Sequence, residues 1–198
     1  MNTGDARAEI MRSIRLHLGE SAPYDHCETL IKTDPAASVF SSPVSLGDEF
    51  KRNLEAVDGH CLLVHNDTEV AETVKQIVAG KKVATSDAPP STKDLFNFDV
   101  GITMAQAGIA ETGTLVLDSS VEQNRLVSLV PPIHIALLDA SRIYATLGET
   151  LAALQSGAEL SPAVTFITGP SRTADIELTL AIGVHGPQEL YVIINQNS

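Results

Sequence analysis

The residues best suited to chemistry in this sequence lie where an apolar segment gives way to a polar run that begins at Thr168. The segment from Ala163 to Ile167 predicts a strand, and the run after it predicts the start of a helix. The first turn of a helix carries unpaired backbone N–H groups and the positive end of the helix dipole, so a phosphate or carboxylate is stabilised beside it. Arg172 adds a guanidinium that can hold the same anion through two hydrogen bonds. Five residues of this run are therefore candidates for binding an anionic ligand: Thr168, Gly169, Ser171, Arg172 and Thr173.

The same run also has a purely structural interpretation. Ser171 or Thr173 can cap the expected helix, and Asp175 and Glu177 then complement its dipole. Capping and ligand binding are compatible, so the pattern leaves both open.

A second candidate is Glu111, which lies in a glycine-bounded turn before the expected strand from Thr114 to Leu117. A carboxylate in such a turn can act as a nucleophile, a base or a hydrogen-bond acceptor. The alternative is that Glu111 only caps backbone amides of the turn. The spacing of Gly108 and Gly113 is similar to that of the phosphate-binding loop of nucleoside triphosphatases, but the lysine of that loop is missing and the segment leads into a strand. That class of site is excluded.

A third cluster joins Asn124 and Arg125 to a pair of prolines and His134. The prolines fix the approach to a buried strand, and His134 at its start can titrate near neutral pH and serve as an acid or a base. A histidine that only makes structural hydrogen bonds is the commoner case. His185 follows the last expected helix, and spacing does not decide whether it caps that helix or reaches the site.

Composition limits the partners of these residues. The chain has 198 residues, 43% of them hydrophobic, which is enough for one sizeable core. Its 13 Lys and Arg against 25 Asp and Glu give a formal net charge of -12, which argues against nucleic acid or an anionic membrane as a partner. No apolar stretch approaches the length of a membrane span and none is typical of a signal peptide, so the sequence predicts a cytoplasmic protein.

Metal ligands are sparse. The two cysteines, Cys27 and Cys61, form neither a disulfide framework nor a Cys-x-x-Cys pair, and the six histidines are scattered. The sequence therefore predicts no metal site, and iron–sulfur ligation by this chain alone is not expected.

The elements that must position the candidate residues begin near residue 46. Residues 1–45 predict an N-terminal helix from Ala6 to Leu18 and a proline-rich connector from Gly19 to Ser45. Residues 46–198 alternate between helical and strand patterns, which predicts an α/β domain. The expected helices are Leu46 to Val57, Thr68 to Val78, Ser141 to Leu154 and Thr173 to Ile182. The expected strands are Cys61 to Val64, Lys82 to Thr85, Val100 to Met104, Thr114 to Leu117, Ile133 to Leu138, Ala163 to Ile167 and Leu190 to Ile194.

Several of these strands are apolar at consecutive positions, as in the run from Leu190 to Ile194. Strands of this kind are buried on both faces of a mainly parallel sheet. We therefore expect an open, mainly parallel sheet with helices on both faces.

Four of the segments described above together resemble the LUD domain of the lactate-utilisation protein C family. They are Glu111-Thr112-Gly113-Thr114, Pro131-Pro132-Ile133-His134, the run from Thr168 to Glu177, and His185-Gly186-Pro187. The resemblance extends from about Leu46 onward, is densest after Gly108 and keeps the motifs in the family's order.

This resemblance implies a fold like that of the NagB/RpiA/CoA-transferase superfamily and a role in oxidising L-lactate to pyruvate within an iron–sulfur-containing, multi-subunit system. It also implies that the motif turns line one cleft at the carboxyl ends of the strands. On this basis Glu111 and His134 are the proton-handling candidates. The expected substrate-binding residues are Thr112, Gly113, Thr114, Arg125, Thr168, Gly169, Ser171, Arg172 and Thr173. With two cysteines and no glycine fingerprint for NAD, the chain is expected to hold no cofactor, and the iron–sulfur clusters are expected in partner subunits.

Two hypotheses follow. In the first, the chain is a subunit of the lactate-oxidising assembly and contributes assembly contacts or an anion-binding pocket. In the second, it is a stand-alone enzyme that acts on a small anion, a sugar phosphate or an acyl-CoA, through Glu111 and Arg172. Fold-level analogy does not decide between them.

Overall fold

The computed structural model describes residues 45–86, 90–119, 124–155, 163–174, 180–182 and 186–197, together with Arg12. The chain separates into two compact units, Met1–Ser41 and Ser42–Ser198. Apart from Arg12 and Ser45, the expected N-terminal helix and connector lie outside the described residues. All described residues except Arg12 belong to the second unit.

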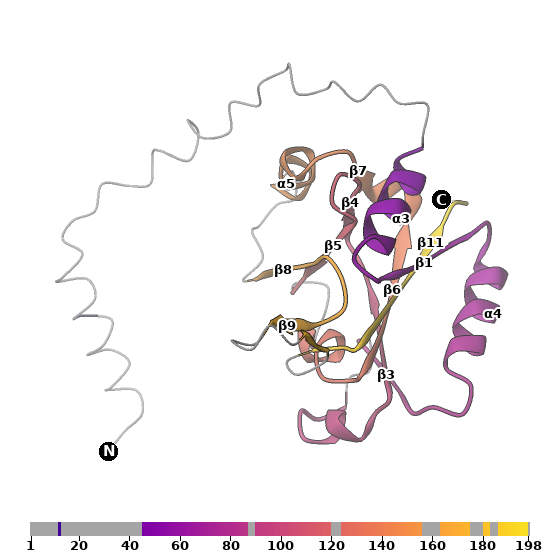
Figure 1. Ribbon diagram of the computed structural model, residues 1–198, viewed down its shortest axis with the longest axis vertical. Coiled ribbons are helices and arrows are strands. Elements are labelled where there is room, and N and C mark those ends of the chain that lie inside the picture. The colour runs from indigo at the N-terminus through magenta and orange to yellow at the C-terminus, as the bar shows by residue number, and fades with distance from the viewer. Residues whose placement is uncertain are drawn as a thin grey trace. The chain divides into compact units, whose positions relative to one another are not determined.

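A five-stranded parallel sheet with the strand order β1-β11-β6-β3-β2 forms the centre of the second unit (Figure 1). Its strands are β1 (His60–Val64), β2 (Val83–Thr85), β3 (Val100–Met104), β6 (Ile133–Asp139) and β11 (Glu189–Asn195). All four neighbouring pairs are parallel. The parallel sheet expected from the consecutive apolar residues is therefore confirmed.

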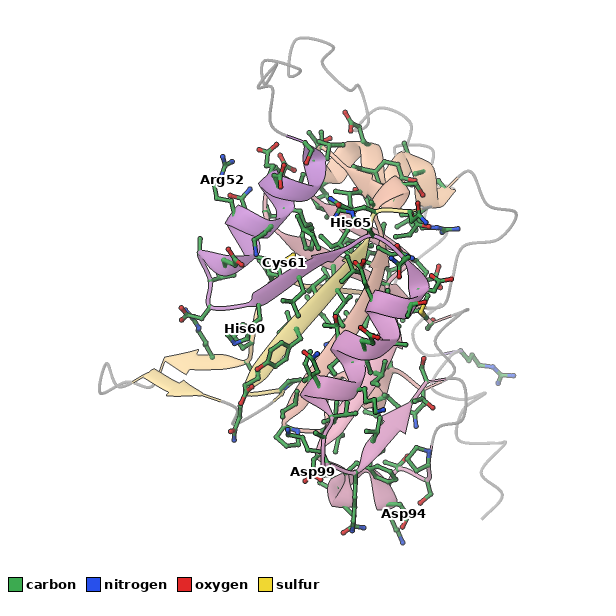
Figure 2. All side chains as sticks on the ribbon, turned by 90° about the vertical axis from the view of Figure 1, so that its right-hand side faces the viewer. Arg52, His60, Cys61, His65, Asp94 and Asp99 are labelled. Atoms are coloured by element: carbon green, nitrogen blue, oxygen red, sulfur yellow. The ribbon has the colours of Figure 1, made fainter. Side chains whose placement is uncertain are left out.

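Helix α4 (Asp67–Ile77) covers one face of this sheet (Figure 2). Its side chains Val70 and Val74 pack against a buried cluster that contains Ile135 of β6 and Ile193 of β11. The helix begins at Asn66, whose side chain accepts a hydrogen bond from the backbone N–H of Glu69.

The opposite face carries helix α3 (Leu46–Glu55) and a second, four-stranded sheet with the order β7-β4-β5-β8 (Figure 1). The strands are β4 (Ala107–Ile109), β5 (Thr114–Asp118), β7 (Ile143–Tyr144) and β8 (Val164–Ile167). Phe50 and Leu54 of α3 join Leu115 and Leu117 of β5 in the core beneath. The expectation of helices on both faces is thus confirmed, and on this side a mostly antiparallel sheet shares the covering with α3.

Helix α5 (Leu147–Gln155) lies over the outer face of the second sheet, where Leu154 packs against Ile109 and Val116. It begins later than the helix expected from Ser141. Ala140–Arg142 form the short 3-10 helix η4 and the next two residues pair as β7. The remaining short helices are η2 (Asp94–Asn97) and η3 (Arg125–Ser128).

The helix expected from Thr173 to Ile182 is wrong. Strands β9 (Arg172–Ala174) and β10 (Leu180–Ile182) pair there as an antiparallel hairpin. The backbone N–H of Ser171, which would be free at a helix start, donates to the carbonyl of Pro187 at 2.8 Å and holds the chain extended. The segment also contains several β-branched residues, which favour strands.

Within the described residues, no helix is both long enough and apolar enough to cross a membrane.

Candidate functional site

Three threonines from two of the sequence motifs form a chain of hydroxyl groups. Thr114 begins β5 and Thr168 follows its neighbour β8. The Thr114 Oγ1 lies 2.7 Å from the Thr112 Oγ1 and 3.0 Å from the Thr168 Oγ1. Thr114 is buried, whereas Thr112 and Thr168 are exposed. When the three hydroxyls donate in sequence, the last one keeps an O–H at an exposed end, which can be donated to a ligand oxygen.

The turn that carries Glu111 and Thr112 is fixed against helix α3. The Asn53 side chain donates a hydrogen bond from Nδ2 to the carbonyl of Ala110 at 2.7 Å. Gly113 has a φ of 65°, and a Cβ at this position would lie 2.3 Å from the backbone nitrogen of Leu54. Only glycine fits this backbone and this contact, so the close approach of the turn to α3 depends on Gly113.

The exposed carboxylate of Glu111 accepts a hydrogen bond from the backbone N–H of Leu147 at 2.8 Å. Leu147 is the first residue of α5, where an acceptor and a negative charge stabilise the unpaired N–H groups. Glu111 thus has a capping role, but the amide that it caps belongs to α5 and not to its own turn. Its catalytic role stays a prediction.

Arg172 begins β9 and therefore does not lie at the start of a helix. Its Nη2 donates to the carbonyl of Val57 at 2.9 Å and forms an ion pair with the carboxylate of Asp58. Val57 and Asp58 belong to the turn that follows α3. The anion site proposed at a helix N-terminus lacks its helix, because the chain is extended at Ser171 and beyond.

Other motif residues converge on the same turn. A Cβ on Gly169 would lie 3.1 Å from Cγ2 of Val57, and a Cβ on Gly186 would lie 3.0 Å from that of Ser171. The turn after α3 leads into β1 at its amino end, and Pro187 lies two residues before the start of β11. The segment from Thr168 to Arg172 therefore runs from the carboxyl end of β8 to the amino ends of β1 and β11.

Four of the residues singled out in the sequence are described only in part or not at all by the structure. Thr173 lies in β9, but its side chain is not among the described ones. Asp175, Glu177 and His185 lie outside the described residues.

His134 of β6 is fully buried and belongs to a different environment. Its Nε2 lies 2.9 Å from Oγ1 of Thr103, and its Nδ1 has no hydrogen-bond partner in the part of the chain that the structure describes. Burial lowers the pKa of His134 to about 4, so the imidazole is neutral at neutral pH. Its role as an acid or a base stays a prediction.

Arg125 is exposed at the start of η3, which Asn124 caps by accepting a hydrogen bond from Leu126 N at 3.0 Å. The carbonyl of Val127 in η3 lies over Gly101 of β3, where a Cβ would approach it to 1.9 Å. Gly101 is the cross-strand partner of His134, so the third sequence cluster is brought together on β3 and β6.

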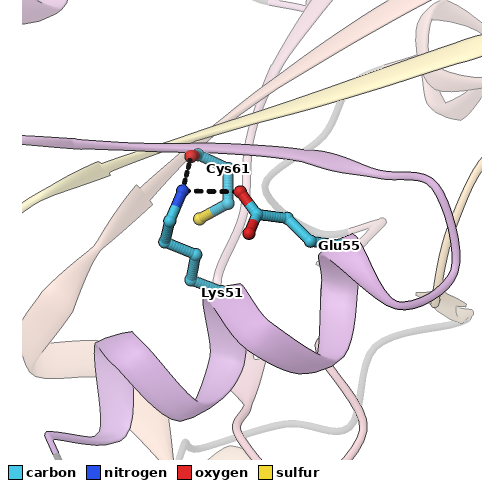
Figure 3. Close-up of polar contacts among 3 residues, drawn as sticks. All are labelled: Lys51, Glu55 and Cys61. Atoms are coloured by element: carbon cyan, nitrogen blue, oxygen red, sulfur yellow. Dashed lines mark hydrogen bonds and ion pairs between the residues drawn. The ribbon is translucent and has the colours of Figure 1, made fainter.

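Cys61 of β1 faces the core beside α3 (Figure 3). The Lys51 Nζ donates to the Cys61 carbonyl at 2.6 Å and to Oε1 of Glu55 at 2.5 Å. Burial raises the pKa of the Cys61 thiol to about 12, Lys51 opposes the shift and Glu55 adds to it. A thiol with such a pKa is not a nucleophile at neutral pH.

The described residues contain no group of three or more His, Cys, Asp or Glu side chains that could hold a metal ion. An open cavity of about 350 Å³ lies at the amino ends of β3, β6 and β11. Its lining contains none of the candidate residues and consists of Gly80, Lys81, Asp99, Pro132, Ile133, Gln188 and Glu189.

Sequence reasoning missed Asn53 and Asp58, which hold the two motif turns. The Asp58-Gly59 pair is a turn signal in the sequence, so the end of the helix before it could be predicted. The contact between Asp58 and Arg172, however, spans 114 residues and has no local pattern.

The chain is similar to known proteins in its sequence and in its structure. The LUD domain matches residues 86–195. An uncharacterised protein of Neisseria meningitidis serogroup B is 48% identical over 107 residues, which are 52% of this chain and 44% of that protein. The chain thus spans less than half the length of that relative.

Longer alignments join the chain to proteins named lactate utilization protein C. The protein from an Exiguobacterium species is 33% identical over 156 residues, covering 76% of this chain and 68% of its own length. The protein from Bacillus velezensis is 30% identical over 190 residues, covering 86% of this chain and 76% of its own length.

A crystal structure of a DUF162 family protein from Deinococcus radiodurans has the same fold. The two structures superimpose with a TM-score of 0.62 at 21% sequence identity, over 78% of this chain and 100% of that one.

Proposed function

The chain belongs to the LUD domain family, and on this premise we propose that it acts in lactate utilisation as a subunit of a system that oxidises L-lactate to pyruvate. The observation that carries the proposal is its similarity, over most of its length, to proteins named lactate utilization protein C. The parallel α/β fold with its motif turns in place agrees with that membership.

We assign the redox centres to partner subunits. Oxidation of L-lactate to pyruvate removes two electrons and two protons, so an electron acceptor is required. An iron–sulfur cluster is usually held by four cysteine thiolates, and the chain has two cysteines. The buried thiol of Cys61 is not available as a ligand in this fold. Iron–sulfur-containing partners in the cytoplasm therefore complete the proposal.

Two contributions remain for this chain: assembly of the complex and binding of a small carboxylate. For the second, the threonine chain supplies a hydroxyl donor at Thr112 or Thr168, and Arg172 supplies a positive charge four residues after Thr168. In a chain with a net charge of -12, an anionic ligand needs such a local positive group.

A stand-alone enzyme acting on a sugar phosphate or an acyl-CoA is the competing function. It requires Glu111 to act as a nucleophile or a base and Arg172 to bind the anion. The observed contacts give this less support, because the carboxylate of Glu111 caps α5.

Growth of a deletion strain of the native host tests the proposal. The strain should fail to grow on L-lactate, should grow normally on pyruvate, and should recover growth on L-lactate when the full chain is restored. Normal growth of the deletion strain on L-lactate, in a host with no second copy of the gene, would contradict the proposal.

A further inference from the structure

We propose that Asp58 is a positioning residue for Arg172, and that the turn after α3 completes the carboxylate site although it precedes the region that matches the LUD domain. The inference rests on the proposed function in so far as the ligand is the carboxylate of a small hydroxy or keto acid. The matched region begins at residue 86, whereas α3 ends at Glu55.

The contacts of Arg172 define the role of this turn. Two hydrogen bonds to described residues use Nη2, one to the carbonyl of Val57 and one to the carboxylate of Asp58. Across the described part of the chain, no hydrogen bond is made by Nε or Nη1 of Arg172. A guanidinium has five N–H donors, and within the described residues the two Nη1–H groups have no partner and can donate to an oxygen of a ligand carboxylate. Nη2 is thus anchored to the turn after α3, and Nη1 can donate to a ligand.

The backbone conformation at Asp58 does not by itself require an aspartate at this position. Asp58 has a φ of 61°, which is the left-handed region that glycine adopts at little cost. The helix end itself is closed by the Gly59 N–H, which donates to the carbonyl of Leu54 at 3.0 Å. Glycine would therefore serve the turn at least as well as aspartate. What aspartate adds is a carboxylate that contacts Arg172.

The ion pair between Asp58 and Arg172 contributes little to the stability of the fold. The loss of this pair should therefore change the position of Arg172 without unfolding the chain. The Asp58 side chain is 80% exposed and that of Arg172 is 32% exposed, so water screens their attraction. Removal of the carboxylate should release the guanidinium and the start of β9 while the core beneath α3 stays intact.

The test compares Asp58→Gly with Glu72→Gln, which removes a negative charge from the exposed face of α4. Asp58→Asn removes the charge, keeps a hydrogen-bond acceptor and tolerates the left-handed backbone. Each full-length variant is expressed in the deletion strain, and three quantities are measured. They are the melting temperature, the hydrogen exchange of residues 168–172, and the apparent KM and kcat for L-lactate oxidation in cell extracts.

We expect Asp58→Gly to melt within about 2 °C of the wild type, because an exposed pair is weak. Its residues 168–172 should exchange faster, and its apparent KM should rise about tenfold with little change in kcat, as expected when a charge-assisted contact is misplaced. Asp58→Asn should be intermediate and Glu72→Gln should resemble the wild type. An unchanged KM in Asp58→Gly would overturn the inference.

Failure of the proposed function gives a different result. In that case the wild-type chain itself restores no L-lactate oxidation, and hydrogen exchange alone decides the positioning role. Faster exchange at residues 168–172 in Asp58→Gly, but not in Glu72→Gln, would support the anchoring of Arg172. Equal exchange in all variants would contradict it.

Discussion

At the scale of single residues, burial determines which side chains can exchange protons with a ligand. His134 is enclosed between the central sheet and its covering, with Thr103 as its hydrogen-bond partner. Glu111 and Arg172, in contrast, reach the surface. This contrast favours Arg172 over His134 as a group that meets a ligand directly.

The buried imidazole predicts a loss of stability in acid. Its pKa in the folded chain is lowered to about 4 from the usual histidine value of 6.5, so as the pH falls the unfolded chain binds a proton at this residue before the folded chain does. The stabilisation is complete above pH 6.5 and is lost as the pH falls towards 4. The loss relative to His134→Gln should be on the order of 3 kcal/mol, measured by urea unfolding at several pH values.

Thr103→Val provides the control for this prediction. It removes the hydrogen-bond partner of His134 but keeps the buried imidazole, so its unfolding free energy should decline with pH as that of the wild type does. If the difference between wild type and His134→Gln is the same at pH 6.5 and pH 4, the imidazole is not held neutral by burial.

The Cys61 thiol should resist alkylation in the native chain. With a pKa raised to about 12 by burial, about one thiol in ten thousand is ionised at pH 8. In a Cys27→Ser background, iodoacetamide should label Cys61 only after denaturant is added, and mass spectrometry measures the labelled fraction. Rapid labelling of the native protein would contradict the burial of this thiol.

At the scale of elements, α3 is the part that holds the two motif turns in place. Asn53 and the backbone at Leu54 fix the turn between β4 and β5, and the turn after the helix fixes the start of β9. The candidate site thus depends on a helix that carries none of the predicted site residues.

Gly113→Ala tests the close contact between this helix and the β4–β5 turn. Alanine would adopt an unfavourable φ and would also press on the backbone of Leu54, which cannot move aside cheaply. We expect a loss of about 3 kcal/mol or more in the free energy of unfolding, measured with urea.

Gly80→Ala is the matched control. Gly80 has a φ of 73°, but a Cβ there would meet nothing within 4 Å. This substitution should lower the free energy of unfolding only because alanine must adopt a positive φ, by about 1 kcal/mol. Equal losses in the two variants would mean that the contact between Gly113 and α3 contributes nothing.

Most elements could be predicted from the sequence because their patterns are local. The strands of the central sheet are apolar at consecutive positions, and α3 and α4 have clear apolar faces and capping residues. The hairpin of β9 and β10 could not be predicted in the same way. Its sequence also suits a helix start, and the hydrogen bond from Ser171 to Pro187 that decides the conformation is not local.

The candidate site was predictable in its parts but not in its arrangement. Local motifs identified Glu111, the threonines and Arg172. The partners that fix them, Asn53, Asp58 and Leu147, come from other elements and are related only by the fold. The analogy with open parallel sheets does not foresee a second sheet on one face, so the sequence could not place Arg172 beside the turn after α3.

At the scale of the whole molecule, the chain is an acidic α/β domain, and we propose that it acts together with redox partner subunits. The fold is shared with the Deinococcus radiodurans protein. The net charge of -12 suits a partner with basic surfaces and makes local groups such as Arg172 necessary for binding an anion. Assembly and carboxylate binding are the roles that such a domain can supply.

We propose that this chain oxidises L-lactate only together with iron–sulfur-containing partner subunits. Anaerobic isolation of the tagged full chain from native cells grown on L-lactate tests this proposal. The preparation should contain stoichiometric, cysteine-rich partner proteins, should absorb visible light as iron–sulfur clusters do, and should reduce an added electron acceptor when L-lactate is supplied. The chain stripped of these partners should show none of this activity. A colourless chain recovered alone from lactate-grown cells, or one that oxidises L-lactate at the full rate without partners, would contradict the account.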